Sequence, residues 1–432
     1  MRSALRTSCG SMWRSPPVRL QRFLALKSTM HLRTYATSRW RQLRRGGTTS
    51  VAITSVDVLS LTAPLDRPIS TSFGAMHQRN AVLVGLRDER GITGWGESWT
   101  NFPGWSGQER VAILTEALVP QVLGREAADV ETLYDELSHR LRHLMVQWGA
   151  PGPIHQALSA IDCALWDLHA RLLDLPLHHL LGGDTLMVPI YASGLGPVDP
   201  VGTSRWLADL GVDAFKLKVG FGIDTDRRNL HALRSAYGAG ATIMVDANRA
   251  WNHDAAVAML DVLETCDVRW LEEPLDGDDE ALVAFRNVCS LDVAAGENVY
   301  GLERYERLLE DGAVDVIQPD VTKNGGITTA RRVCQRAVAL GKAHALHFLG
   351  NAPGQRASAH LFAAEPGGVF LEFDANANPV NANLLRTDLP ITEGHLDLRA
   401  NVPGIGWEPD SGLVERHLAA RRTLGGRSGY LT

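Results

Sequence analysis

The segment Ala214-Phe215-Lys216-Leu217-Lys218-Val219-Gly220 decides the fold class, because a short apolar run ending in polar residues and glycine returns at intervals along the chain. Seven further segments share this pattern: VPIYASG (188–194), TIMVDAN (242–248), VRWLEEP (268–274), VAAGE (293–297), VDVIQP (314–319), AHALHF (343–348) and VFLEFD (369–374). These eight strand candidates recur about every 25 residues with amphipathic stretches between them, which is the β/α rhythm of a closed parallel barrel. The α/β barrel is predicted to occupy residues 184–374.

The residues before the barrel follow a different pattern. Alternating segments at 56–61 and 81–86 predict strands, and long helical patterns follow at 109–144 and 154–173. We therefore expect an α+β capping domain over residues 51–183. Residues 375–432 are loop-rich and are expected to return to this cap.

The first 50 residues differ from the rest in charge. The 432-residue chain has a formal charge of −6, but its first 50 residues hold eleven basic residues and no acid. The remainder therefore has 32 basic against 49 acidic residues, which argues against a nucleic-acid partner. An Arg- and Ser-rich leader without acids suits an organelle transit peptide, and a start codon assigned too far upstream explains it equally well. The predicted location is cytoplasmic, or the mitochondrial matrix if the leader is a transit peptide.

Cysteines and apolar runs exclude two further classes. The five cysteines are widely spaced without a CxxC pair, so neither a disulfide framework nor a zinc cluster is predicted. No run approaches the roughly 18 uncharged apolar residues of a membrane span, so no membrane partner is expected.

Polar residues stand at the carboxyl ends of the second to eighth predicted strands, where barrel enzymes place their active sites. In chain order they are Lys216 and Lys218, Asp246 and Asn248, Glu272, Glu297, Asp320 and Lys323, His347, and Glu372. Three carboxylates on successive strands, Asp246, Glu272 and Glu297, supply hard oxygen ligands suited to Mg²⁺ or Mn²⁺. Three unrelated salt-bridged acids are the alternative.

The remaining strand-end residues have the chemistry of proton transfer. Lys216 and Lys218 lie two apart on one strand, so they face the same way and are expected to lower each other's pKa toward that of a base. Asp320 can orient His347, which moves a proton. Glu372 can donate a hydrogen bond to an oxyanion if its pKa is raised.

The ordered set of KLK (216–218), DAN (246–248), EEP (272–274), GEN (296–298), QPD followed by KNGG (318–326), and LEF (371–373) resembles the mandelate racemase-like branch of the enolase superfamily. The resemblance covers nearly everything from Val51 onward. It implies a modified (β/α)7β TIM barrel with an enolase-like N-terminal cap, and homo-oligomers such as dimers or octamers. It favours this branch over the muconate lactonizing one because Asp320 stands where that branch has a lysine, and His347 is present.

The resemblance also implies the role of each site residue. Asp246, Glu272 and Glu297 would bind Mg²⁺, which holds the carboxylate of a small-molecule substrate. Lys218 and His347, the latter paired with Asp320, would be acid/bases on opposite faces of the α-carbon. Lys216 would neutralise the carboxylate, and Glu372 would hydrogen-bond the developing enediolate.

Two cap loops, at about 70–78 and 98–107, are implied to set specificity. They offer Phe73, Met76, Phe102 and Trp105 as an apolar lid, which alternatively only excludes water, and His77 and Asn101 as polar members. A second substrate carboxylate would require a cation there, and Arg79 is the nearest candidate. Asn248 is expected to contact the substrate.

Opposed acid/bases allow several reactions. The favoured prediction is dehydration of an acid sugar, an aldonate or aldarate, to a 2-keto-3-deoxy acid. The alternatives are a racemase or epimerase of an α-hydroxy or α-amino acid derivative, a sugar-lactone cycloisomerase, a metal-dependent aldolase, and a catalytically silent barrel.

Overall fold

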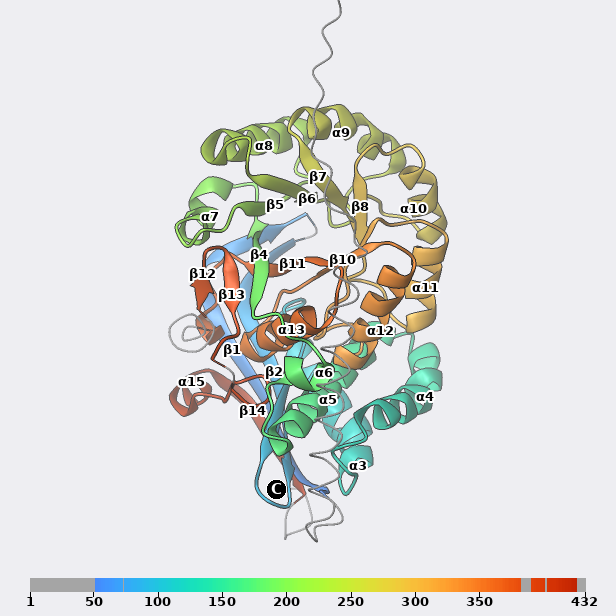
Figure 1. The fold of residues 1–432 in the computed structure, drawn as a ribbon, viewed down its shortest axis with the longest axis vertical. Coiled ribbons are helices and arrows are strands. Elements are labelled where there is room, and N and C mark those ends of the chain that lie inside the picture. The colour runs from blue at the N-terminus through green and yellow to red at the C-terminus, as the bar shows by residue number, and fades with distance from the viewer. Residues whose placement is uncertain (1–50, 73, 382–389, 401, 426–432) are drawn as a thin grey trace, which may run out of the picture.

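The computed structural model describes residues 51–72, 74–381, 390–400 and 402–425, which form a barrel and a cap containing a separate sheet (Figure 1). The leader and the lid residue Phe73 lie outside these ranges. In the described part of the chain, no helix combines the length and apolar character that crossing a membrane requires.

The barrel consists of eight parallel strands joined by seven helices. Strand β11 pairs with β4 and closes the sheet, in the order β4-β5-β6-β7-β8-β9-β10-β11. The predicted (β/α)7β barrel is therefore confirmed. Its elements are β4 (Met187–Leu195), α7 (Pro200–Ala208), β5 (Ala214–Lys218), α8 (Ile223–Tyr237), β6 (Thr242–Asp246), α9 (His253–Thr265), β7 (Val268–Glu272), α10 (Asp279–Arg286), β8 (Asp292–Ala295), α11 (Leu302–Glu310), β9 (Val316–Ile317), α12 (Gly326–Ala339), β10 (Ala343–Leu346), α13 (Ala352–Ala364) and β11 (Gly368–Asp374).

The strand register brings charged residues to one level of the barrel. Lys218 on β5 is opposite Asp246 on β6, and Asp246 is opposite Glu272 on β7. Because the strands are parallel, these side chains emerge together at the carboxyl end, beyond apolar residues that fill the barrel interior. Those buried residues include Met244 and Trp270.

The cap is built on a four-stranded antiparallel sheet in the order β14-β1-β2-β3. The strands are β1 (Ile53–Thr71), β2 (Gly74–Asp88), β3 (Thr93–Ser98) and β14 (Leu418–Gly425), and β14 pairs with β1 from the far end of the chain. The cap helices are α2 (Ser106–Ala112), the π-helical η1 (Ile113–Leu118), α3 (Val119–Val122), α4 (Val130–Trp148), α5 (Pro151–Leu172) and α6 (Leu177–Leu181).

The predicted single helical stretch over 109–144 is wrong. The chain leaves the helix at Leu123 and turns through Gly124, whose φ of +78° an L side chain rarely adopts, before α4 begins.

The predicted helix over 154–173 matches α5, which packs closely across β3. A Cβ at Gly96 would stand 2.1 Å from the carbonyl oxygen of Ala160, so glycine is required for this approach.

The remaining elements lie after the barrel. The short strands β12 (Ile391–Thr392) and β13 (His395–Asp397) extend the barrel sheet, because β13 pairs antiparallel with β4. The 3-10 helix η2 (Pro379–Asn381) and helix α15 (Ser411–His417) both contact β1.

Candidate active site

A cavity of about 490 Å³ lies between the cap and the carboxyl ends of the barrel strands. The end of the long β1–β2 hairpin and the loop after β3 contribute the cap side of the cavity. The ends of β4, β5 and β11 and the loops after β6, β7, β8, β9, β10 and β11 contribute the barrel side. Of the residues predicted for the site, those lining it are Lys218, Asn248, Glu297, His347, Glu372, Met76 and Phe102. Lys216, Asp246, Glu272 and Asp320 lie just beyond this lining, and all four are buried.

The two lysines of β5 each contact a carboxylate on a neighbouring strand. Lys216 Nζ lies 2.7 Å from Glu272 Oε1 and 3.0 Å from Glu372 Oε1, and Lys218 Nζ lies 2.5 Å from Asp246 Oδ2. Burial alone would lower both pKa values, but the facing carboxylates outweigh it and hold the pKa of each lysine above its ordinary value. Lys216 does lower the pKa of Lys218, as expected, but the carboxylates outweigh this effect, so the predicted net lowering toward the pKa of a base is wrong for this arrangement.

The structure brings Asp320 and His347 together behind the cavity wall. His347 Nδ1 lies 2.7 Å from Asp320 Oδ2, and its Nε2 contacts Glu297. Asp320 is itself held by the backbone N–H and the hydroxyl of Thr322, each at 2.7 Å. Burial lowers the pKa of His347, but the charges of Glu297 and Glu372 and the bond to Asp320 raise it well above its ordinary value. These contacts favour the protonated imidazole, the form that can act as an acid.

Glu372 differs from the prediction that a raised pKa makes it a hydrogen-bond donor. Burial raises its pKa, but Lys216, His347 and Lys218 outweigh burial and lower it to about 2. Its carboxylate accepts hydrogen bonds from Ser193 and, at 3.2 Å, from the backbone N–H of Phe348. Glu372 is therefore ionised and acts as an acceptor.

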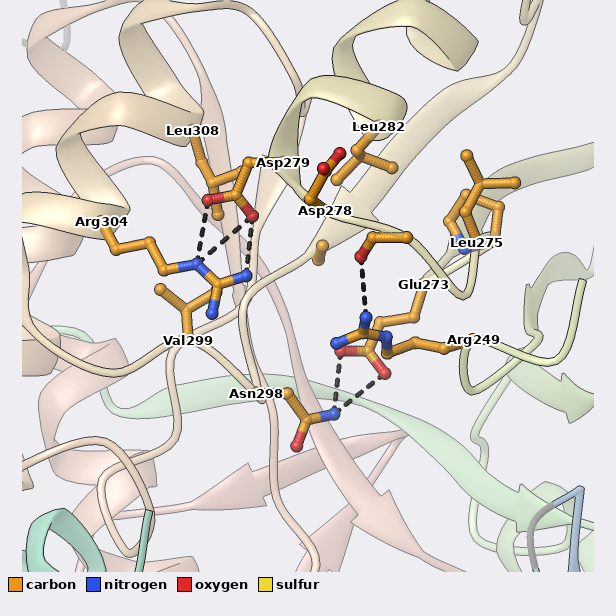
Figure 2. Close-up of a pocket in the computed structure, with 13 residues that line it drawn as sticks. Arg249, Glu273, Leu275, Asp278, Asp279, Leu282, Asn298, Val299, Arg304 and Leu308 are labelled. Carbon is orange, nitrogen blue, oxygen red and sulfur yellow. Dashed lines mark hydrogen bonds and ion pairs between the residues drawn. The ribbon is translucent and has the colours of Figure 1, made fainter. Parts of the chain in front are cut away.

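Amide side chains donate to the carboxylates of the site, and one of them, Asn298, joins two carboxylates. Asn248 donates its backbone N–H and its side-chain amide to Asp246, at 2.8 and 3.1 Å. Gln318 donates to Glu272 at 2.6 Å. Figure 2 shows Asn298 directed at Glu273, whose two oxygens accept at 2.9 and 3.0 Å, and the same amide reaches Glu297 at 3.0 Å.

The buried side chains at the floor of the cavity include more acids than basic groups, a charge balance that suits a cation. In the described part of the chain, six acids with buried side chains face four basic groups: Asp246, Glu272, Glu273, Glu297, Asp320 and Glu372 against Lys216, Lys218, Lys323 and protonated His347. Burial and the nearby Asp246 raise the pKa of Glu272 to about 8, and burial and Glu297 raise that of Glu273 to about 7. With every group counted as ionised, the six acids exceed the four basic groups by two charges, and the raised pKa values of Glu272 and Glu273 reflect this crowding of buried carboxylates.

The three carboxylates predicted as metal ligands have the oxygen chemistry for such a cation. They come from adjacent strand ends, but each contacts a protein cation: Asp246 contacts Lys218, Glu272 contacts Lys216, and Glu297 contacts His347. In the described ranges, no group of three or more acid, imidazole or thiol side chains is arranged to hold a metal as it stands. Binding one would exchange these ion pairs for metal contacts.

Only some of the predicted lid residues face the cavity. Residues 74–78, expected in a loop, continue strand β2, whose alternation buries Met76 toward the cavity and exposes His77. Phe102 lines the cavity, whereas Trp105 is 66% exposed and stands outside the lining. Asn101 is buried and donates to the backbone oxygen of Leu349 at 2.5 Å, so it joins the cap to the barrel loop after β10.

Arg79 and Lys323 line the cavity with contacts that the sequence did not predict, and Ser193 was not predicted at all. Arg79 pairs with Asp374 two residues after Glu372. Lys323 Nζ lies 2.8 Å from Asn298 Oδ1 and 4.6 Å from the ring centre of Trp99. Ser193 precedes a strand-end glycine, a position at which serine is unremarkable, so only the three-dimensional structure places it here.

The arrangement of acids, lysines and an Asp–His pair at the mouth of a barrel defines an acid/base enzyme. Residues 53–182 match the mandelate racemase/muconate lactonizing enzyme N-terminal domain, and residues 203–413 match the enolase C-terminal domain-like family. The chain belongs to the mandelate racemase/muconate lactonizing enzyme family of the enolase superfamily.

Curated relatives in this family catalyse different reactions. The chain is 29% identical over 369 residues to the D-xylonate dehydratase of Haloferax volcanii, a match covering 79% of this chain and 86% of that one. It is 32% identical over 319 residues to the 3,6-anhydro-alpha-L-galactonate cycloisomerase of Streptomyces coelicolor, covering 71% and 83%.

Solved structures resemble the protein over both the cap and the barrel. A mandelate racemase/muconate lactonizing enzyme from Bordetella bronchiseptica RB50 has a TM-score of 0.78 at 35% identity, covering 85% of this chain and 99% of that one. A racemase from Streptomyces coelicolor A3(2) with bound magnesium has a TM-score of 0.77 at 27% identity, covering 85% and 100%.

Proposed function

We propose that the protein dehydrates an acid sugar to a 2-keto-3-deoxy acid. The observation that carries this proposal is one cavity bordered by Lys218 from the second barrel strand and by His347 from beyond the seventh, so that two proton-transfer groups can act on one bound molecule. Ser193, Asn248 and Asn376 also line it and can hydrogen-bond hydroxyl groups. The likeness to a D-xylonate dehydratase supports the same substrate class.

A magnesium ion on Asp246, Glu272 and Glu297 is part of this proposal. The excess of buried carboxylates and the magnesium-bound racemase of the same fold support it. When bound, the cation would supply positive charge for the substrate carboxylate and for the charge that develops on it during proton removal.

Lys218 is proposed to remove the α-proton. The negative charge of Asp246 raises the pKa of Lys218 and keeps the lysine protonated. Lys218 would become a base once Asp246 binds the metal instead. Lys216 remains cationic between Glu272 and Glu372 and offsets the negative charge that develops on the substrate.

His347 is proposed to complete the elimination. Its Nε2 gives a proton to the β-hydroxyl, the C–O bond breaks and water leaves, while the electrons of the former α-C–H bond form the double bond. The resulting enol tautomerises to the 2-keto acid. Asp320, bonded to Nδ1, fixes the imidazole with Nε2 directed away from it and holds its proton.

The test incubates the purified full-length chain and MgCl₂ with a panel of aldonates, aldarates and α-hydroxy acids in D₂O. NMR follows α-deuterium, and a keto-acid assay follows dehydration. Keto acid from a sugar acid, abolished in His347→Asn, is the expected result. Exchange with stereoinversion and no keto acid would establish a racemase or epimerase instead. Conversion of an anhydro-sugar acid or lactone would establish a cycloisomerase, the activity of the Streptomyces coelicolor relative.

A further inference from the structure

At the carboxyl end of β11, the cavity wall contains a buried ion pair that joins the cap to the barrel. Arg79 on β2 has no exposed side-chain surface, and its guanidinium contacts Asp374, which lies at the end of β11. Arg79 Nε also donates to the backbone oxygen of Ala377 at 3.2 Å. Its Nη1 is buried and has no hydrogen-bond partner among the described residues.

Asp374 is held as firmly as its partner. One oxygen accepts from the backbone N–H and side-chain amide of Asn376, at 3.0 and 2.9 Å, which leaves the other oxygen for Arg79. The neighbouring Gly194 has no room for a side chain, since a Cβ there would lie 2.7 Å from Asp374 Oδ1. Both members of the pair therefore have fixed positions in the cavity wall.

Every cationic side chain along the described lining already has a carboxylate within 4.0 Å. The pairs are Arg79 with Asp374, Lys218 with Asp246, Arg249 with Asp276, Lys323 with Glu297, and His347 with Asp320 and Glu297. Figure 2 shows that Arg249 also donates to a nearby backbone oxygen, that of Gly277 at 2.7 Å. The Arg79–Asp374 and Arg249–Asp276 pairs involve none of the three proposed metal ligands, so a second carboxylate that reaches the Arg79–Asp374 wall would find no uncompensated cation there.

We propose that the Arg79–Asp374 pair selects acid sugars with one carboxylate and an uncharged hydroxylated tail, and rejects diacids. This inference rests on the proposed function and narrows its substrate to the aldonate class. Asp374, whose charge Arg79 offsets, keeps some exposed surface in this wall and offers a substrate hydroxyl an acceptor. A carboxylate beside Asp374 would instead lose its hydration and meet a like charge, which is unfavourable.

Two substitutions move this preference in opposite directions. Asp374→Asn keeps an oxygen for Asn376 and releases the positive charge of Arg79, so it should improve diacid binding. Arg79→Gln leaves Asp374 uncompensated, so it should weaken diacid binding further. A general loss of cavity shape would instead weaken both acids in both variants.

Calorimetry provides a readout that does not depend on turnover. The full-length protein in MgCl₂ is titrated with matched pairs, D-gluconate against D-glucarate and D-galactonate against D-galactarate. We expect the wild type to bind the monoacid of at least one pair tenfold or more tightly than the diacid. Asp374→Asn should reduce that ratio at least tenfold, and Arg79→Gln should increase it. Asp135→Asn, which breaks an exposed pair with Arg332 far from the cavity, should leave the ratio unchanged within twofold.

Several results would overturn the inference: tighter binding of the diacids, binding of neither class, or equal shifts in the two variants. Keto-acid formation is measured on the same samples. A monoacid preference without keto acid would refute dehydration and leave the selectivity intact. Keto acid formed preferentially from diacids would support dehydration and refute the selectivity.

Discussion

Glu97 of the cap anchors the barrel loop that carries His347, and substituting it tests whether that anchor matters for stability and turnover. It lies on β3 and is buried, and its carboxylate accepts the backbone N–H groups of Asn351 and Gly354, at 2.9 and 3.1 Å. These donors lie at the start of α13, directly after the loop that carries His347. Gly350 and Gly354 leave just enough space, since a Cβ on either would lie 2.9 Å from a Glu97 oxygen.

The perturbation is Glu97→Ala. It leaves two buried backbone donors unpaired, and each costs about 1–3 kcal/mol, so we expect the free energy of unfolding to fall by about 2–6 kcal/mol at pH 4.5. Because the loop carrying His347 would lose its anchor on the cap, turnover should fall about tenfold or more.

The pH dependence has a definite sign. Burial raises the pKa of Glu97 from 4.5 to about 7, against hydrogen bonds from Asn351 and Gly354 that lower it. A carboxyl whose folded pKa is raised stabilises the fold fully below its unfolded pKa and loses that contribution as the pH rises through the folded value. The difference between wild type and Glu97→Ala should therefore narrow by about 3 kcal/mol between pH 4.5 and pH 7.

Urea unfolding of both proteins at half-unit steps from pH 4.5 to pH 8 measures this difference. Other buried acids with raised pKa values, such as Asp162 and Asp167, are present in both proteins and cancel. Glu89→Ala, at an exposed turn, is the control and should stay within about 0.5 kcal/mol of wild type at every pH. A difference that stays constant or grows with pH would refute the reasoning.

Four further predictions follow from the same structure. His347→Asn should lower kcat about 10²–10⁴-fold, and circular dichroism should show an intact fold. Asp320→Asn replaces the charged acceptor at Nδ1 with a neutral one and lowers the pKa of His347, so the alkaline fall in the kcat profile should move to lower pH. EDTA should abolish turnover, and MgCl₂ at about 100 times its Kd should add about 2.7 kcal/mol of stability, measured by thermal unfolding. Gly96→Ala should lower unfolding free energy by about 3 kcal/mol or more because its Cβ would meet backbone atoms of α5, whereas Gly240→Ala, with open space around it, should change it little.

The barrel could be predicted from sequence because its determinants are local. Each strand needs only a short apolar run, and each strand end faces the same opening whatever the sequence between them. Lys218, Asp246 and Glu272 could be grouped from their positions in the sequence because parallel register fixes their level. The determinants of the cap fold are less local. Whether 109–144 forms one helix depends on a turn at Gly124. Whether Met76 or His77 faces the cavity depends on how far the β1–β2 hairpin extends.

The site electrostatics could not be predicted from spacing along one strand. Two lysines two residues apart repel each other, and that repulsion is visible in the sequence. What reverses its effect is the approach of Asp246 and Glu272 from adjacent strands to within 2.5 and 2.7 Å of the lysine nitrogens. An ion pair at such a distance in a buried site outweighs a like charge farther away, because the interaction falls with distance and is poorly screened there. The same argument explains Glu372, whose pKa is lowered by Lys216 and His347 despite full burial. The basicity of the proposed proton-transfer groups therefore depends on which carboxylates face them, so binding of a cation to Asp246 and Glu272 would change the basicity of both lysines.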